Sequence, residues 1–261
     1  MIRQQIIAHN RRAWDEQVRR KNRWTRPVSA EETAAAREGK WQVLLTPQIP
    51  VPADWFPDMQ GLQVLALASA GGQQGPIFSA AGADVVVFDN SGAQLEQDMV
   101  VAERDGLEIE TIQGDMSDLS RFADETFDLI FNPVSNCFIP DVNVMWQECF
   151  RVLKPGGRLL SGFNNPVLYL FGDEVYGFSE NLQVRFKIPY SDLENLTADQ
   201  LKKGKQQGLP LEFGHTIEDQ IGGQLRAGFV IMGFYEDRNT PEECAISEYI
   251  PTFMATLAKK K

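Results

Sequence analysis

The stretch that decides the fold is "VLALASAGGQQGP", residues 64–76, in which an apolar run gives way to a loop of small residues. Small residues let backbone N–H groups approach a ligand closely, and the N-terminus of a following helix favours negative charge. Pro76 suits the first turn of such a helix. The stretch therefore predicts a strand, a ligand-binding loop and a helix.

The segments that follow this loop alternate between short apolar runs and helical patterns, which is typical of repeated strand, helix, strand units. The predicted strands are residues 63–68, 84–88, 109–113, 127–131 and 157–163. Two more are predicted at residues 229–235 and in the last segment, "YIPTFMATLAKK" (249–260). We therefore expect an α/β fold with a doubly wound, Rossmann-like, mostly parallel sheet.

A helix is predicted between the fourth and fifth strands, because apolar residues recur there at steps of three and four. These residues are Val142, Met145, Trp146, Cys149, Phe150 and Leu153. Pro155, Gly156 and Gly157 end the pattern. The three cysteines of the chain have no metal-ligand spacing, so we expect packed, reduced thiols and no metal site.

The first 57 residues form an N-terminal helical arm in this interpretation, and residues 58–261 form the main domain. Residues 2–24 predict one helix with Ile7, Trp14 and Val18 on one face, and a second helix is predicted from a Ser29 cap to a stop at Gly39. The proline-rich connector "TPQIPVPADWFP" (46–57) cannot continue a helix.

Charge excludes some partners. The net charge of -11 disfavours nucleic acid, although residues 1–26 hold eight Lys or Arg against two acids and are expected to fold back onto the acidic body. The chain has no apolar run of membrane-spanning length and no signal-peptide core, so we expect a cytoplasmic protein with no membrane partner.

Residues 164–215 interrupt the alternation with an aromatic-rich insertion, which predicts a lid or a substrate-binding element. His215 at its end is a candidate general base, although a hydrogen-bonded structural histidine is the competing interpretation. Three tyrosines of the insertion could assist a proton transfer: Tyr169, Tyr176 and Tyr190.

The small-residue loop fits two cofactors. Ala70, Gly72 and Gly75 match a degenerate dinucleotide fingerprint, with Asp89 nineteen residues beyond Ala70, which predicts an NAD(P)-dependent oxidoreductase. Ala68, Ala70 and Gly72 also fit the small positions of a methyl-donor loop. The loop by itself does not decide between them.

Four later motifs resemble, in order and spacing, those of class I S-adenosylmethionine-dependent methyltransferases of the small-molecule, UbiE-like (type 11) group. They are "VVVFDNS" (85–91), "IQGDMSDL" (112–119), "FDLIFNPVSN" (127–136) and "RVLKPGGRLL" (151–160). The resemblance spans about Gly61 to Lys260, and "HNRRAWDEQV" (9–18) is similar to the helix that such enzymes fold over the donor. It implies seven strands with the last one antiparallel.

The resemblance also assigns roles to residues. Asp89 would accept hydrogen bonds from both ribose hydroxyls of S-adenosyl-L-methionine, and Asp115 would accept one from the adenine amino group. Asn90, next to Asp89, is also an implied donor-binding residue. The other implied donor-binding residues are Ala68, Ser69, Ala70, Gly71, Gly72, Gly114, Met116, Asn132, Pro133 and Val134. The implied substrate or lid residues are Trp14, Asn136 and Asn164.

The loop departs from the family pattern in two ways. Ala66 replaces a common acidic residue, and alanine replaces glycine at Ala68 and Ala70, which is unfavourable where φ is positive. We expect methyl transfer to a small molecule by orientation in a closed site, with His215 as candidate base. A nicotinamide-dependent oxidoreductase and a non-catalytic donor-binding protein remain the rival hypotheses.

Overall fold

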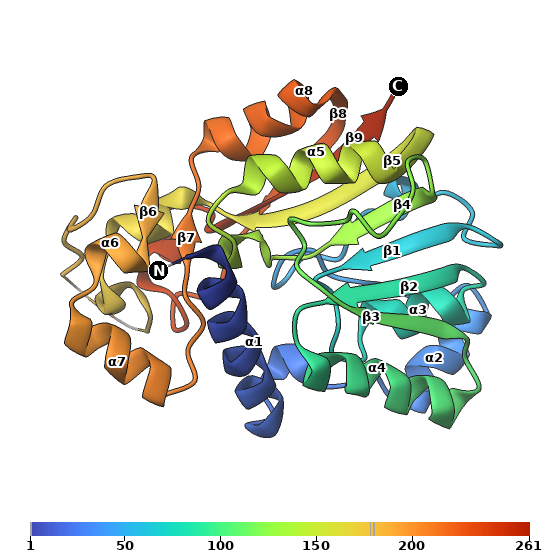
Figure 1. Cartoon of the computed structure of the whole chain (residues 1–261), viewed down its shortest axis with the longest axis horizontal. Helices are drawn as coiled ribbons and strands as arrows, with labels where there is room; N and C mark the ends of the chain where they lie inside the picture. The colour runs from blue at the N-terminus through green and yellow to red at the C-terminus, as the bar shows by residue number, and fades with distance from the viewer. Residues whose placement is uncertain (1, 178, 180) are drawn as a thin grey trace.

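A seven-stranded sheet with helices on both faces forms the body of the computed structural model, which describes residues 2–177, 179 and 181–261 (Figure 1). The strand order is β3-β2-β1-β4-β5-β9-β8. Their bounds are β1 Gln63–Leu67, β2 Asp84–Asp89, β3 Ile109–Gln113, β4 Phe127–Asn132, β5 Leu153–Asn164, β8 Phe229–Asp237 and β9 Phe253–Lys260. β9 pairs antiparallel with both β5 and β8, and the other pairings are parallel. The predicted fold class is confirmed.

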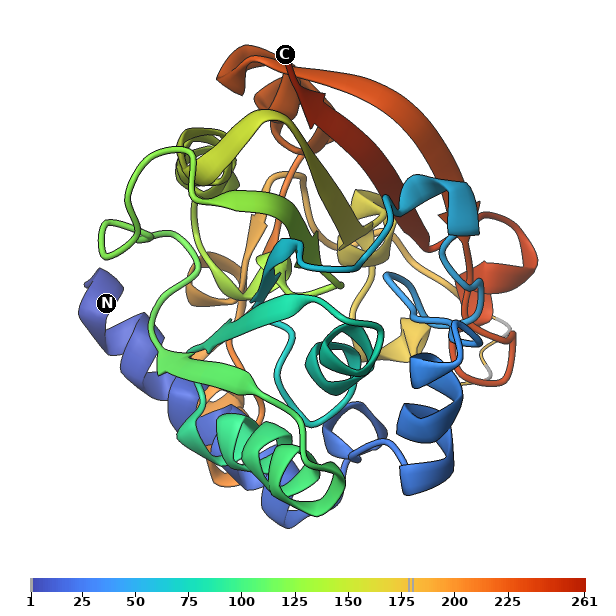
Figure 2. The ribbon, with the colours of Figure 1, turned by 90° about the vertical axis from the view of Figure 1, so that its right-hand side faces the viewer.

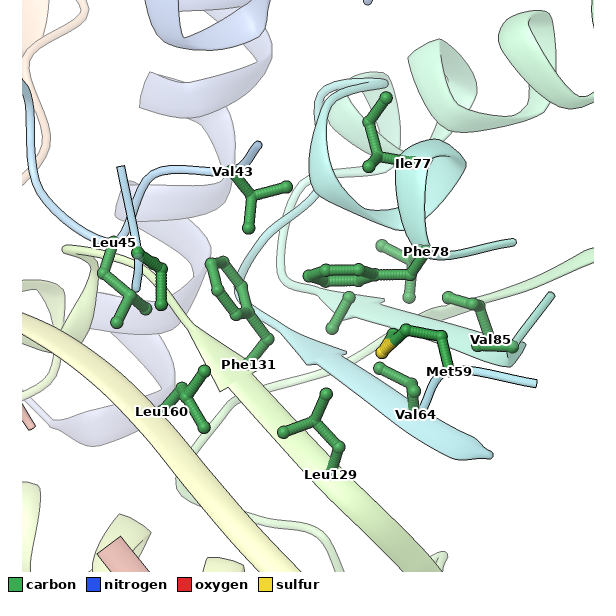
Figure 3. Packing of buried hydrophobic residues seen from close by; sticks show 14 of the residues in the cluster. Val43, Leu45, Met59, Val64, Ile77, Phe78, Val85, Leu129, Phe131 and Leu160 are labelled. Atoms are coloured by element: carbon green, nitrogen blue, oxygen red, sulfur yellow. The ribbon is translucent and has the colours of Figure 1, made fainter. Parts of the chain in front are cut away.

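Both faces of the sheet are covered, which explains why β1 reads as a continuous apolar run. Val64 and Ala66 belong to the cluster under α2 (Ala30–Arg37), α3 (Gln74–Ala80) and α4 (Gly92–Asp105). Figure 3 shows part of that cluster, where the rings of Phe78 and Phe131 meet edge to face with centroids 5.1 Å apart. Leu65 and Leu67 point to the opposite cluster, which includes buried residues of α5 (Val142–Val152).

The helix predicted at 142–153 is confirmed as α5, with Met145, Trp146 and Cys149 fully buried. It ends at Val152, and Leu153 begins β5 by pairing with Phe127, so this strand starts four residues before the predicted position. α8 (Gly223–Ala227), preceded by the π-helical turn Glu218–Gly222, packs beside α5.

The N-terminal segment folds onto the body and its helices differ in part from the prediction. α1 spans Arg3–Arg19 and ends five residues early, at a turn in which Lys21 has a φ of 55°. Its buried residues are Ile6, Asn10 and Ala13 rather than the predicted face, because α1 packs between α4 and the insertion (Figure 2). The second helix is confirmed as α2, with Ser29 and Glu32 forming a capping box.

The division of the chain at residue 57 stays a prediction. Val43, Leu45 and Trp55 from the segment before it share one buried cluster with Val64 of β1. Short helical turns connect the longer elements. They are Arg23–Thr25, Ala53–Trp55, Asn136–Phe138 and Ala245–Glu248.

The insertion forms a small unit beyond the carboxyl ends of the central strands, beside α1 (Figure 1). It contains the turns Pro166–Leu170 and Asp173–Val175, the two-stranded ribbon β6 (Tyr190–Ser191) and β7 (Phe213–Gly214), and the helices α6 (Asp192–Asn195) and α7 (Ala198–Gln206). Ile6 of α1 packs against Leu211 and Phe213 of this unit. Within the described part of the chain, no helix is long and apolar enough to cross a membrane.

Candidate active site

A cavity of about 850 Å³ lies at the carboxyl ends of the parallel strands, where open α/β sheets place their ligands. Its walls come from these strand ends, from α1, from the connector at residues 42–48 and from the insertion. The predicted site residues that line it are Trp14, Ala68, Ser69, Ala70, Asp89, Asn90, Gly114, Asp115, Met116, Pro133, Val134 and Asn164. The chain thus brings predicted site residues from six separate segments to one cavity.

The loop after β1 forms one wall. Ala68 has a φ of 47°, a left-handed conformation that costs an alanine energy, and its N–H donates to Phe88 O at 2.7 Å. Gly71 and Gly72 also have positive φ, but they lie beneath the N-terminal segment instead of lining the cavity. A Cβ on Gly71 would lie 3.1 Å from Trp24 O, so these glycines let the segment pack closely over the loop.

Asp89 ends β2 with its carboxylate at the cavity wall. Oδ1 accepts from Ser91 N at 2.8 Å, and Oδ2 accepts from Ala70 N at 3.3 Å, so the side chain joins the first two strand-end loops. Burial raises the pKa of Asp89 to about 6, against the opposing effect of these backbone donors. Asn90 beside it holds α1 in place, because its Nδ2 donates to Ile7 O at 2.9 Å.

Asp115 follows β3 and is held by both neighbouring and distant groups. Arg3 Nη2 donates to Asp115 Oδ2 at 2.8 Å, and Ser117 Oγ donates to Oδ1 at 2.9 Å. The preceding Gly114 permits the close passage of Phe88, because a Cβ there would lie 2.0 Å from the ring. The sequence pattern located Asp115 but not its ion pair with Arg3.

Besides Gly71 and Gly72, three predicted site residues lie outside the cavity lining, and their side chains form hydrogen bonds within the protein. Asn132 donates to Leu67 O at 2.9 Å and to Ser135 Oγ at 2.8 Å. Asn136 and Gln220 exchange two amide hydrogen bonds, of 2.9 and 3.1 Å. His215 is buried, its Nε2 lies 3.0 Å from Asn136 O, and burial lowers its pKa. These contacts are those expected of a hydrogen-bonded structural histidine, the alternative to a general base.

Sequence reasoning missed a chain of polar groups at the insertion end of the cavity. Asn164 Nδ2 donates to Tyr169 Oη at 2.7 Å, and the Tyr169 hydroxyl donates to Glu212 Oε2 at 2.9 Å. Asn164 and Glu212 line the cavity. The only pattern at this place is a single acidic residue between the apolar Leu211 and Phe213, which ordinarily indicates an extended segment whose acidic side chain faces water, so it did not identify Glu212.

The comparisons with known proteins agree with this architecture. The profile of the methyltransferase domain family matches residues 65–161. The chain is 49% identical to the uncharacterized methyltransferase YbaJ of Bacillus subtilis (strain 168) over 255 residues, 98% of each chain. A sterol 24-C-methyltransferase of Aspergillus fumigatus is 34% identical over 101 residues, 38% of this chain and 26% of that one.

Among solved structures, an S-adenosylmethionine dependent methyltransferase from Mesorhizobium loti shares the fold with a TM-score of 0.61. It is 19% identical, and the match covers 79% of this chain and 94% of that one. The chain therefore belongs to the class I S-adenosylmethionine-dependent methyltransferases. This result decides between the two cofactors that the loop spacing left open, in favour of the methyl donor and of an enzyme.

Proposed function

We propose that this enzyme transfers the methyl group of S-adenosylmethionine to a small molecule held in this cavity. The observation that carries the proposal is that the strand-end loops and the insertion line the same cavity. A donor at the loops and an acceptor at the insertion end would then share one space. Orientation in a site without bulk water is the main requirement of such a transfer.

The donor end offers groups that match the donor's polar edges. The Asp89 carboxylate suits the two ribose hydroxyls and Asp115 suits the adenine amino group, because ionised carboxylates only accept hydrogen bonds. Met116, which is buried at the cavity wall, would pack against the adenine ring. When bound, S-adenosylmethionine supplies a methyl group already activated on a sulfonium. The residues of the chain then have to hold and orient the donor and the acceptor, and to exclude water from the site.

The acceptor end supports a small and largely apolar substrate. Trp14, Phe138, Leu168 and Tyr176 line the cavity, and the Trp14 and Phe138 rings meet edge to face at 5.3 Å. The relative named for a sterol acts on an apolar small molecule, which favours the same class here. The acidic net charge disfavours a nucleic-acid acceptor.

The insertion at 164–215 and α1 act in this proposal as one cover. Asn10 joins them, because its Nδ2 donates to Leu211 O at 3.1 Å and its Oδ1 accepts from Leu211 N at 2.7 Å. His9 Nε2 lies 3.0 Å from Leu209 O. Since α1 is also tied to the donor loops through Asn90 and Asp115, opening this cover would admit donor and acceptor together.

Calorimetric titration with S-adenosylmethionine, S-adenosylhomocysteine and NAD tests the donor assignment. We expect the first two to bind, NAD not to bind, and Asp89→Ala to lose at least tenfold in donor affinity, because a charge-assisted pair of hydrogen bonds is removed. Asp84→Ala is the matched control, since Asp84 is exposed at the opposite end of the same strand. Unchanged affinity in Asp89→Ala would remove Asp89 from the donor site.

A further inference from the structure

We propose that Glu212 is the general base of the methyl transfer and takes the proton from a hydroxyl or amino group of an otherwise apolar acceptor. This inference rests on the proposed function, because it places the acceptor at the insertion end of the cavity. Glu212 lies directly before β7 and lines the cavity with Asn164, Leu168 and Tyr176.

The backbone of Glu212 is held firmly at this place. Its N–H donates to Asp192 Oδ2 at 2.8 Å, and its carbonyl oxygen accepts from Asp192 N at 3.1 Å. The hydrogen bond from the Tyr169 hydroxyl to Oε2, of 2.9 Å, holds the carboxylate itself. The site is therefore preorganised, because its geometry exists before an acceptor binds.

The two carboxylate oxygens of Glu212 have different surroundings. Oε2 accepts from the Tyr169 hydroxyl at 2.9 Å. The same hydroxyl accepts from Asn164 Nδ2 at 2.7 Å, which commits its proton to Glu212. Oε1 has no hydrogen bond to any group in the described part of the chain. Oε1 is thus the oxygen with free lone pairs to receive a proton, while Tyr169 and Asn164 are positioning residues.

No Lys, Arg or His forms an ion pair with Glu212 among the described residues, so a structural salt bridge does not explain this carboxylate. A carboxyl group enclosed without a cation reduces stability, and such groups concentrate at functional sites. The titratable groups that face it are Tyr169, Cys137, Tyr176 and Asp192. All of them are neutral or acidic, so an incoming acceptor is the group that would complement Glu212.

These surroundings also suit the pH at which a base must work. Burial, together with the charge of Asp192, raises the pKa of Glu212 to about 7, against the lowering effect of the Tyr169 hydrogen bond. A base with a pKa near the working pH is ionised in a useful fraction and still binds a proton well. An ordinary exposed glutamate would be a much weaker base.

The reaction balances in atoms and charge. The acceptor oxygen or nitrogen forms a bond to the methyl carbon, the carbon–sulfur bond breaks, and its electron pair stays on sulfur. The acceptor's proton moves to Glu212 Oε1. The products are the methylated acceptor, S-adenosylhomocysteine and protonated Glu212, which then releases its proton to solvent.

Two probes represent the acceptor class: phenol for a hydroxyl and benzylamine for an amino group. Each is titrated into the full chain saturated with S-adenosylhomocysteine, and each is tested for turnover with S-adenosylmethionine between pH 6 and 9. In the wild type we expect binding of at least one probe and a rate that rises with pH through about 7. The rise follows because the base acts in its ionised form.

Glu212→Gln keeps the shape and the acceptor for Tyr169 but removes the basic oxygen. We expect this variant to bind S-adenosylhomocysteine as the wild type does. Its turnover should fall about 10²- to 10⁴-fold, and the rise of the rate with pH (the pH limb) should disappear. Tyr169→Phe should shift that limb to higher pH, because the ionised form loses a hydrogen bond. Glu194→Gln is the matched control, as Glu194 is exposed on α6 of the same insertion.

Wild-type turnover in Glu212→Gln, or a pH limb unchanged in both variants, would overturn the proposal. Failure of both probes to bind the wild type, while S-adenosylhomocysteine binds, would overturn the assigned acceptor class and leave the donor site standing. Failure of S-adenosylhomocysteine itself to bind would instead contradict the proposed function. If circular dichroism shows that Glu212→Gln does not fold, the pH dependence of turnover in Tyr169→Phe decides: a midpoint at the wild-type pH would overturn the proposal.

Discussion

Arg3 Nη2 lies 2.8 Å from Asp115 Oδ2, so the first turn of α1 is tied to the loop after β3, across 112 residues of sequence. The same guanidinium reaches Ser117 O and Ser117 Oγ. This contact places the basic N-terminal segment on the acidic body, as its charge predicted. It also connects the cover of the cavity to a residue assigned to the donor.

Arg3→Ala should therefore loosen the cover more than it unfolds the protein. Half of the Arg3 side chain is exposed, so we expect a loss of at most about 1 kcal/mol, which increases an open population by about fivefold. The measurements are the dissociation rate of S-adenosylhomocysteine and the hydrogen exchange of residues 3–19. Arg19→Ala is the control, because among the described residues the ion pair of Arg19 is with Glu16, within α1 itself. Equal rates in the two variants would contradict the prediction.

Ala68 has a φ of 47° at a position where related loops use glycine, so Ala68→Gly should relieve strain. An alanine in the left-handed conformation destabilises the folded state by about 1–2 kcal/mol. Glycine removes this strain, but its more flexible unfolded chain offsets about 0.5–1 kcal/mol of the gain. We expect the free energy of unfolding in urea to rise by up to about 1 kcal/mol.

The matched control is Ala70→Gly in the same loop, since Ala70 does not have a positive φ. That variant should lose about 0.5–1 kcal/mol. The prediction is wrong if both substitutions change the free energy of unfolding in the same direction.

Asp98 should make the protein less stable as the pH rises. Burial raises its pKa to about 7, whereas an unfolded aspartate titrates near about 4. Between these values the folded protein keeps a proton that the unfolded chain has lost, so rising pH favours unfolding. The raised pKa values of Asp89 and Glu212, about 6 and about 7, act in the same direction.

Asp98→Asn should flatten the curve of unfolding free energy against pH between about 4 and about 7 and stabilise the protein above that range by roughly 1–3 kcal/mol. The amide oxygen can still accept from Gly71 N, which Asp98 Oδ2 holds at 2.9 Å. Glu96→Gln, at an exposed position of α4, is the control and should leave the slope unchanged. A wild-type slope in Asp98→Asn would exclude Asp98 as its source.

The positions of most strands and helices were predictable, because these elements depend on patterns among residues that are close in sequence. Short apolar runs that alternate with helical patterns identified all seven strands of the main sheet, and apolar residues at steps of three and four identified helix α5. Ser29 and Gly39 marked both ends of α2. The end of α1 and the start of β5 were wrong by several residues. α1 ends at a turn in which Lys21 has a φ of 55°, and the pairing of Leu153 with Phe127, a contact distant in sequence, decided the start of β5.

The sequence by itself determined the fold, a ligand-binding loop after β1 and the strand-end positions of Asp89 and Asp115, because strands and loops depend on residues that are consecutive in the chain. Only the tertiary structure decided which polar groups face the cavity. His215 and Asn136 find hydrogen-bond partners away from it, whereas Glu212 reaches its wall through Tyr169 and Asn164. The partners of a side chain depend on segments that come from elsewhere in the chain, and it is burial by those segments that raises the pKa of Asp89, Asp98 and Glu212.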